Sequence, residues 1–344
     1  MEAVTNCLNR IVAGASPSAD EMEWALGAVL DGQAGDAAAA ALLTAVRLRG
    51  ETADELEGAV RAIRKRMTGW RSPIASTRLL DTCGTGGDGL SSVNLSTAAA
   101  IVVAACGIPV VKHGNRAASG NSGSSDVLTA LGVSADPAPD RLATCLTELN
   151  IAFLFAPRFH PGLVRLAPIR RQLPFRTLFN LVGPLCNPAS PAFQLVGSTD
   201  ERRSRLLAAV LARMPHVRRA AVVTGSDGLD EVTLAGPTHA LIVEAGTIRD
   251  ETWRPDDFGL ASVGTEGLRV SGPEESAHRI RRTLAGEPGP VRDYVLANAA
   301  AALRIAGDCS LSEGVRRAAA AVDSGAASRL LVAWVVASSG RAAD

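Results

Sequence analysis

The chain has 344 residues, of which 47% are hydrophobic and 3% aromatic, so it can bury the cores of two domains. Lys and Arg number 35 and Asp and Glu number 35, and this zero net charge argues against nucleic acid or a membrane as a partner. The six cysteines are scattered without a CxxC pair, which argues against a zinc site and a secreted disulfide framework. The start lacks a signal peptide and the most apolar stretch, 98–105, is too short to span a bilayer, so we expect a cytoplasmic protein.

The first seventy residues have the pattern of amphipathic helices. Ser18 and Glu21 have the spacing of a capping box, and apolar residues follow them at helical intervals. Thr52 and Glu55 repeat this arrangement. Because glycines separate the helical segments, we predict a compact helical domain over residues 1–70.

From residue 79 on, short apolar runs alternate with helical segments. Strands are predicted at residues 79–82, 109–112, 151–155, 193–196, 220–224 and 240–243. Helices are predicted at residues 96–106, 126–131, 291–306 and 311–337. This alternation predicts an α/β domain over residues 71–344 with a central, mostly parallel sheet, while helices from about 160–185 join the helical domain.

A glycine loop, GTGGDG at residues 84–89, follows the first predicted strand and precedes a helix that opens near Asn94. Glycines let backbone N–H groups approach a ligand closely, and a helix N-terminus adds unpaired donors and the positive end of a dipole. The loop therefore suits a phosphate group, although Asp88 within it requires a cation beside any bound pyrophosphate. A glycine turn without a ligand is the structural alternative.

The same loop also matches the GxGxxG fingerprint of dinucleotide-binding proteins. That fingerprint requires an acidic residue about 20 positions later to bind the ribose hydroxyls. Residues 89–111 contain no Asp or Glu, and the second predicted strand ends in Lys112 and His113. A nicotinamide-dependent dehydrogenase is therefore disfavoured.

A second polar loop follows the second predicted strand. It begins with KHGNR at residues 112–116 and continues through small and polar residues to Ser124. Ligands of open α/β sheets collect at strand ends, so two anion-binding loops on neighbouring strands indicate a ligand with two phosphate groups. An exposed loop that ends in an ordinary helix N-cap is the alternative.

Two groups of charged residues complete the candidate site. Asp230 and Glu231 follow a predicted strand, and paired carboxylates are ligands that Mg²⁺ prefers beside substrate phosphates. Arg170 can bind a carboxylate through two parallel hydrogen bonds. Taken alone, a solvated surface is the better interpretation of the carboxylate pair and an equally good one of the arginine.

The longer motifs of the chain resemble those of the anthranilate phosphoribosyltransferases. The matching stretches, in the family's order, are residues 84–88, 94–97, 112–116, 176–185 and 225–231. The resemblance implies a homodimer with a small helical domain and a larger α/β domain of the nucleoside phosphorylase and phosphoribosyltransferase type. It also implies transfer of the phosphoribosyl group of phosphoribosyl pyrophosphate to the amine of anthranilate, a step of tryptophan biosynthesis.

The resemblance assigns site residues when the family's contacts are carried over position by position. The implied contacts of phosphoribosyl pyrophosphate are Gly84, Gly87, Asp88, Ser92, Asn94, Leu95, Ser96, Thr97, Lys112, His113, Gly114, Asn115, Arg116, Ala117, Ala118, Ser119, Gly120 and Ser124. The implied contacts of anthranilate are Gly84, Asn115 and Arg170. Two Mg²⁺ ions are implied, one held by Ser96 and the other by Asp230 and Glu231. No catalytic side chain is implied beyond these ligands.

Three positions depart from the family's pattern: Gly120 replaces Ser, Asn121 replaces Lys or Arg, and Cys186 replaces Thr. Two rival functions are a pyrimidine nucleoside phosphorylase, which uses inorganic phosphate as its nucleophile, and a non-catalytic relative that binds nucleic acid. The second rival predicts a basic stripe and a damaged site. The zero net charge, the acidic pair and Arg170 argue against it.

Overall fold

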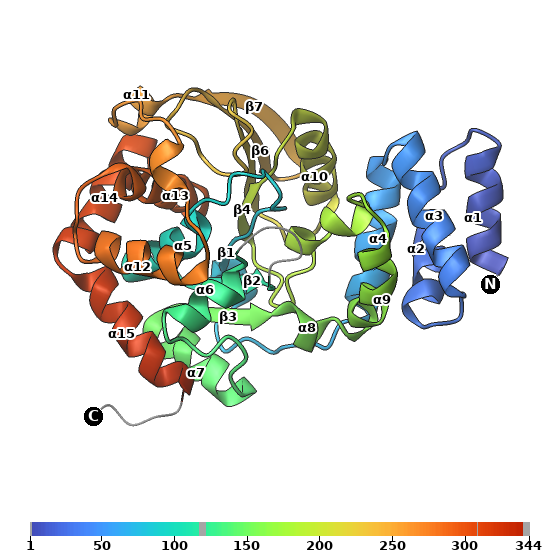
Figure 1. Ribbon diagram of the computed structural model, residues 1–344, viewed down its shortest axis with the longest axis horizontal. Coiled ribbons are helices and arrows are strands. Elements are labelled where there is room, and N and C mark those ends of the chain that lie inside the picture. Colours follow the sequence, from blue (N-terminus) through green and yellow to red (C-terminus); the bar gives the residue numbers. More distant parts are fainter. Residues whose placement is uncertain (1, 117–121, 308, 340–344) are drawn as a thin grey trace.

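A small helical lobe lies beside a larger α/β body in the computed structural model, which describes residues 2–116, 122–307 and 309–339 (Figure 1). The lobe begins with four helices, α1 (Glu2–Val12), α2 (Ala19–Leu30), α3 (Asp36–Arg49) and α4 (Ala53–Arg66). Both predicted capping boxes are confirmed, because the side chains of Ser18 and Thr52 accept backbone hydrogen bonds at the starts of α2 and α4. The apolar faces behind these caps form the core of the lobe.

A seven-stranded sheet forms the centre of the described α/β body, in the order β3-β2-β1-β4-β5-β6-β7. The strands are β1 (Leu80–Thr82), β2 (Val110–Gly114), β3 (Ile151–Phe155), β4 (Phe193–Gly197), β5 (Arg219–Gly225), β6 (Thr238–Glu244) and β7 (Thr247–Trp253). The first five strands in this order pair in parallel, whereas β6 and β7 pair antiparallel. The expected α/β class with a mostly parallel sheet is therefore confirmed.

The order of the strands reverses between β1 and β4. From β1 the chain proceeds to β2 and β3 on one side, and from β4 it proceeds to β5, β6 and β7 on the other. Ligands of open α/β sheets bind in the crevice outside the carboxyl ends of such a strand pair. The glycine loop leaves β1 and Gly197 ends β4, so both lie at this crevice.

Helices surround the sheet (Figure 1). The remaining helices, including short 3₁₀ turns labelled η, are η1 (Ser76–Arg78), α5 (Leu95–Ala105), α6 (Ser124–Ala130), α7 (Pro139–Leu149), α8 (Ala156–Phe159), α9 (Pro161–Gln172), η2 (Leu178–Asn180), η3 (Gly183–Leu185), α10 (Glu201–Arg213), α11 (Pro255–Phe258), η4 (Glu266–Leu268), α12 (Pro273–Leu284), α13 (Pro290–Ala306), α14 (Leu311–Asp323) and α15 (Ala326–Ser339).

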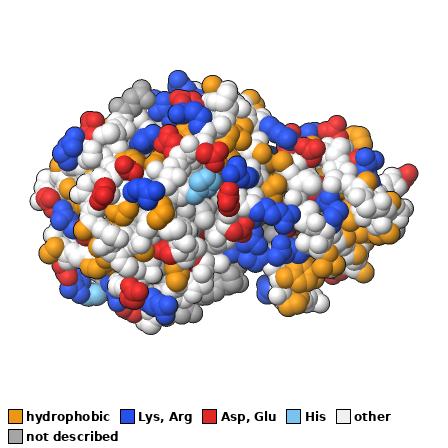
Figure 2. Space-filling view, turned by 90° about the horizontal axis from the view of Figure 1, so that it is seen from above, with side chains coloured by type: hydrophobic (Ala, Val, Ile, Leu, Met, Phe, Trp, Pro, Cys, Tyr) orange, Lys and Arg blue, Asp and Glu red, His pale blue; other side chains and the backbone are white. Residues whose placement is uncertain are grey.

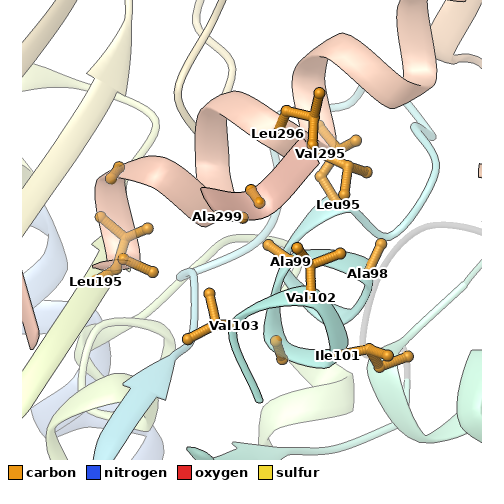
Figure 3. Close-up of a cluster of buried hydrophobic side chains, with 14 of the residues drawn as sticks. Leu95, Ala98, Ala99, Ile101, Val102, Val103, Leu195, Val295, Leu296 and Ala299 are labelled. Carbon is orange, nitrogen blue, oxygen red and sulfur yellow. The ribbon is translucent and has the colours of Figure 1, made fainter. Parts of the chain in front are cut away.

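Alternate residues of the central strands face different cores, as the period of a strand requires. In β5, Ala221 and Val223 belong to the cluster that contains α5 and α13. Ala220 and Val222 belong to the cluster that contains α10 and the helical lobe. Figure 3 shows side chains of α5 and α13 directed into their shared cluster. This packing gives α5 a rigid base, and the N-terminus of α5 opens at the crevice.

The 160–185 segment contributes to the core of the lobe. Leu166 and Ile169 of α9, together with Leu178 and Phe179 of η2, belong to the same buried cluster as α1 to α4. The segment returns the chain to the lobe between β3 and β4. The division of the chain at residue 70 stays a prediction.

Some elements differ from the sequence-based expectations. The helix predicted over residues 311–337 is two helices, because Gly325 adopts φ of 73° between α14 and α15. Strand β7 was not predicted, and most of its residues are exposed and polar. Within the described ranges no single helix has the length and hydropathy to cross a bilayer; α14 and α15, bent by 64°, pass that test only as a pair.

The contact between α2 and α4 generates a stability prediction. A Cβ added at Gly58 of α4 would overlap the carbonyl oxygen of Ala19 and lie 2.9 Å from Cβ of Met22. Gly58→Ala should therefore lower the free energy of unfolding by about 1–3 kcal/mol, although alanine favours a helix by about 1 kcal/mol. Urea titration measures the change, with Gly69→Ala, which meets open space, as the matched control. A Gly58→Ala variant as stable as the parent would contradict this packing.

Candidate active site

A cavity of about 530 Å³ opens at the carboxyl ends of β1 and β2. The glycine loop, the N-terminus of α5 and the second polar loop line one side, and residues of α9, η2 and η3 line the other. Figure 2 shows Lys and Arg side chains gathered where the larger body meets the smaller lobe, on a face where charges are otherwise mixed. Positive charge is thus concentrated locally in a chain whose net charge is zero.

The structure brings most of the predicted site residues to this cavity. Those that line it are Gly84, Gly87, Asp88, Ser92, Asn94, Leu95, Ser96, Lys112, His113, Gly114, Asn115, Arg116, Ser124, Arg170, Asp230 and Glu231. Thr97 is fully buried, and its hydroxyl contacts the side chain of Asn94 instead. The predicted contacts Ala117, Ala118, Ser119 and Gly120 lie outside the described residues, as does Asn121. The roles assigned to all these residues stay predictions.

The glycine loop adopts left-handed backbone conformations that residues other than glycine rarely adopt. Gly86, Gly87 and Gly89 have φ of 64°, 85° and 75°. Gly84 is needed for a different reason, because a Cβ there would lie 2.9 Å from Oδ2 of Asp230. The absence of a Cβ at Gly84 therefore lets the loop lie close to the carboxylate of Asp230.

The N-terminus of α5 opens into the cavity. Oδ1 of Asn94 caps the helix by accepting the N–H of Thr97 at 3.2 Å. The N–H of Ser96 donates to Oε1 of Glu231 at 3.1 Å. Because the N-terminus is the positive end of the helix dipole, it stabilises negative charge at this position.

Lys112 places a buried positive charge beside Ser96, at the N-terminus of α5. It is 2% exposed, and its Nζ donates to the carbonyl of Thr82 and, at 3.1 Å, to Oγ of Ser96. A buried ammonium is tolerated when hydrogen bonds and nearby negative charge compensate it. Lys112 therefore forms part of the floor of the site and not a mobile surface contact.

Asp230 and Glu231 form the negative wall of the cavity. Gly197 at the end of β4 makes room for them, because a Cβ there would overlap the carbonyl group of Asp230. Withdrawal from water raises the pKa of both carboxyl groups; the charge of Asp88 adds to the shift at Asp230, and the charge of Asp230 adds to that at Glu231. A cation beside the pair would offset the cost of keeping both ionised.

The donor atoms fit Mg²⁺. This ion keeps several waters and is usually bound by one or two carboxylates together with substrate phosphates. No three Asp, Glu, His or Cys side chains converge as a metal site in the part of the chain that the structure describes. Asp230, Glu231 and the hydroxyl of Ser96 supply oxygen atoms only, so they suit a magnesium ion whose coordination a phosphorylated ligand completes.

Two neutral histidines lie at the inner end of the cavity. Their rings are 5.1 Å apart in an edge-to-face arrangement, with Nε2 of His113 and Nε2 of His160 3.2 Å apart. Nδ1 of His113 lies 3.3 Å from the carbonyl of Gly183 and therefore donates, which leaves its Nε2 to accept from His160. Burial lowers the pKa of His113 to about 3 and that of His160 to about 4. The pair holds Gly183 in place without adding charge at neutral pH.

A buried carboxylate–amide contact anchors the segment that follows η3. Asp81 of β1 accepts the backbone N–H of His113 at 3.2 Å and Nδ2 of Asn187 at 2.8 Å. Nδ2 of Asn187 also donates to the carbonyl of Val111 at 2.8 Å. Arg64 of α4 donates to the backbone carbonyl of Asn187 at 3.4 Å. The segment is thus attached both to the sheet and to the helical lobe.

Arg170 presents a cation on the side of the cavity that faces the lobe. Its guanidinium lies 5.8 Å from the ring centroid of Phe179, within range of a cation–π contact. Burial lowers the pKa of Arg170, and no acidic side chain of the described residues contributes to that shift. A guanidinium remains protonated at neutral pH, so Arg170 can receive a carboxylate from a ligand.

His160, Phe179 and Arg176 are among the cavity residues that received no role from the sequence. Phe179 and Arg176 lie within residues 176–185, which carried part of the resemblance, and that is the signal that could have identified them. His160 has no such signal, because its contact with His113 arises only when β2 and β3 pair.

Two family models match the chain: the α/β domain of a glycosyl transferase family over residues 76–328 and the helical bundle domain over residues 5–67. An anthranilate phosphoribosyltransferase from Methylobacterium sp. (strain 4-46) is 45% identical over 98% of this chain and 99% of its own length. The crystal structure of that enzyme from Thermus thermophilus is 38% identical, with a TM-score of 0.88, and covers 98% of this chain and 99% of its own. The enzyme from Saccharomyces cerevisiae, in complex with PRPP and Mg, is 26% identical, with a TM-score of 0.89 and 99% coverage of both chains.

The chain belongs to the anthranilate phosphoribosyltransferase family. The match extends over nearly the whole chain, so the helical lobe and the α/β body belong to the family together. The resemblance inferred from the motifs is confirmed. These relatives give no support to a dehydrogenase, a nucleoside phosphorylase or a nucleic-acid-binding protein.

In this family member, the close approach of β4 to the acidic pair should make magnesium binding sensitive to a side chain at Gly197. Gly197→Ala should displace the backbone at Asp230 and raise the Mg²⁺ concentration needed for half-maximal activity roughly 10–100-fold, as when the support of a metal ligand is lost. Steady-state rates over a magnesium titration measure this effect, with Gly69→Ala as the control. Identical magnesium titrations for Gly197→Ala and the parent would remove Gly197 from this role.

Proposed function

We propose that the chain transfers the phosphoribosyl group of phosphoribosyl pyrophosphate to the amine of anthranilate, a step of tryptophan biosynthesis. The observation that carries this proposal is 45% identity to an enzyme of that activity over nearly the full length, with the site residues gathered in one cavity. The complex of the yeast relative with PRPP and Mg supports the same substrate and metal.

The reaction breaks the bond between the anomeric carbon and pyrophosphate and forms a bond from that carbon to the amine nitrogen, which loses a proton. Positive charge develops on the ribose and negative charge on the departing oxygens. The N–H groups of the glycine loop and of the α5 N-terminus are donors for those oxygens. Lys112, fixed beneath Ser96, adds a positive charge that does not have to reorganise during the reaction.

Asp230, Glu231 and Ser96 would hold magnesium, which when bound neutralises charge on the pyrophosphate. We propose two ions, one at Ser96 and the other at Asp230 and Glu231, as the family resemblance implies. The contact between the N–H of Ser96 and Oε1 of Glu231 supports neighbouring positions for the two ions.

The acceptor needs orientation more than activation, because the aromatic amine of anthranilate is already neutral and nucleophilic at pH 7. We propose that Arg170 binds its carboxylate and that Asn115 and Gly84 contact it. The neutral His113–His160 pair closes the inner end of the cavity without competing for the carboxylate. The main contribution of the protein is to hold the amine and the anomeric carbon close together.

An assay of the complete reaction tests the proposed function. Protein is mixed with Mg²⁺, phosphoribosyl pyrophosphate and anthranilate, and the fluorescence of anthranilate is followed. We expect the fluorescence to fall only when all components are present and to stop falling when a chelator removes magnesium. No fall, together with phosphorolysis of uridine or thymidine, would instead establish a nucleoside phosphorylase.

Arg170→Ala should weaken the binding of anthranilate. Loss of a hydrogen bond to a charged group costs about 1.5–3 kcal/mol, which corresponds to an increase in the anthranilate KM of roughly 10- to 150-fold. Arg171→Ala is the matched control, because Arg171 is the exposed neighbour of Arg170 and does not line the cavity. Equal anthranilate KM values for the two variants would disprove the assignment of Arg170.

We also propose that the protein is a cytoplasmic homodimer. The support for the compartment is that its cysteines are free thiols, which suit a reducing environment. The support for the dimer, besides the family resemblance, is that Val12, Trp24 and Leu48 of the helical lobe are 84%, 66% and 82% exposed. Sedimentation equilibrium should give twice the chain mass, and a monomer at micromolar concentration would contradict the dimer.

A further inference from the structure

Arg176 extends across the cavity from the side of the helical lobe to the glycine loop. It lies between α9 and η2, next to Thr177, the N-cap residue of η2. Its Nη2 donates to the carbonyl of Thr85 at 2.7 Å, and its Nη1 donates to the carbonyl of Gly86. One guanidinium thus binds two successive carbonyls of the loop, and the planar group suits such a paired contact.

The direction of these hydrogen bonds determines where the N–H groups of the loop point. The carbonyl and the N–H of a trans peptide point in opposite directions, and the peptide between Thr85 and Gly86 is trans. Arg176 accordingly lies on the carbonyl side of this peptide, whereas the Gly86 N–H is directed toward the carboxylate of Asp230. By the same reasoning, the N–H of Gly87 points away from the guanidinium.

Gly87 leaves room for the guanidinium of Arg176 beside the loop. A Cβ at this position would overlap the guanidinium of Arg176, so the absence of a side chain is what admits the arginine. Gly86 and Gly89 have similar left-handed conformations, with φ of 64° and 75°, but a Cβ at either would meet open space. A side chain at position 87 would thus have to displace the guanidinium, whereas one at position 86 or 89 would not.

The other end of Arg176 is firmly held. The adjacent backbone N–H of Thr177 donates to Oδ1 of Asn180 at 2.9 Å, which closes the short η2 turn. Phe179 in that turn is buried in the core of the lobe and lies against Arg170, the proposed anthranilate ligand. Arg176 therefore connects a fixed point beside the proposed acceptor site to the backbone of the proposed donor site.

We propose that Arg176 is a positioning residue that orients the peptides of the glycine loop, so that their N–H groups face the acidic pair and the pyrophosphate. This inference rests on the proposed function and extends it, because it links the two substrate sites through one side chain. Arg176 acts through the backbone of residues 85–87 and needs no direct contact with either substrate.

The test compares Arg176→Met, which removes both donors, with Arg176→Lys, which retains the charge but not the paired contact. Binding of phosphoribosyl pyrophosphate with Mg²⁺ is measured by calorimetry without anthranilate, so that no turnover occurs. We expect its Kd to rise at least about tenfold in Arg176→Met and less in Arg176→Lys. The anthranilate KM at saturating phosphoribosyl pyrophosphate should change by a smaller factor than this Kd, since Arg170, the proposed carboxylate ligand, is unchanged. Arg171→Met is the control for loss of an exposed arginine.

Hydrogen exchange of the ligand-free protein separates positioning from direct contact. Exchange at the amides of residues 85–89 should be faster in Arg176→Met than in the parent and in Arg171→Met. Gly87→Ala should also accelerate exchange, and more than Gly89→Ala, which introduces backbone strain alone.

Two results would overturn the inference. Weaker binding with unchanged exchange would mean that Arg176 contacts the substrate directly, and unchanged binding would mean that it has no role at the donor site. If Arg176→Met does not fold, as judged by circular dichroism, the binding and exchange of Arg176→Lys are compared with those of the parent instead. An inactive parent would refute the proposed function itself, whereas an active parent with unaffected Arg176 variants would refute only this inference.

Discussion

The site depends on one close approach, that of the backbone at Asp230 to the ends of β1 and β4. Gly84 and Gly197 permit this approach from two neighbouring strands, because a Cβ at either would meet Asp230. The acidic pair consequently lies against a loop rich in N–H donors and against the N-terminus of α5. Carboxylates withdrawn from water in this way have raised pKa values, and a bound cation would stabilise their ionised form.

Side chains of the helical lobe and of the segment around η2 and η3 contact the α/β body. Arg64 reaches the segment after η3, and Asn187 in that segment reaches Asp81 of β1. Arg176 reaches the glycine loop itself. The arrangement of the two proposed substrate sites would therefore depend on how the lobe sits against the body.

Local features of the fold were predictable from the sequence, because they depend on neighbouring residues. The capping box at Ser18 was recognisable from the spacing of Ser and Glu, and the run at residues 151–155 matches β3 (Ile151–Phe155) residue for residue. The glycine loop was identified from its composition and its place after a strand. Strand β7 was not, because exposed polar residues give it no apolar alternation.

Contacts between distant parts of the chain could not be predicted in the same way. Arg176 meets carbonyls about ninety residues earlier in the chain, and no local spacing records that contact. The pairing of His113 with His160 likewise exists only after β2 and β3 align. Thr97, carried over from a family motif, lies behind the cavity wall and contacts the cap residue Asn94, and its contact with the ligand stays a prediction.

In the proposed function, backbone N–H groups and the acidic pair together hold a doubly phosphorylated sugar. A crystal structure of the protein with phosphoribosyl pyrophosphate and Mg²⁺ would show whether they do. We expect pyrophosphate density between the glycine loop and the α5 N-terminus, with magnesium bound by Asp230 and Glu231. Pyrophosphate bound elsewhere, or bound there with the acidic pair turned away and without metal, would contradict it.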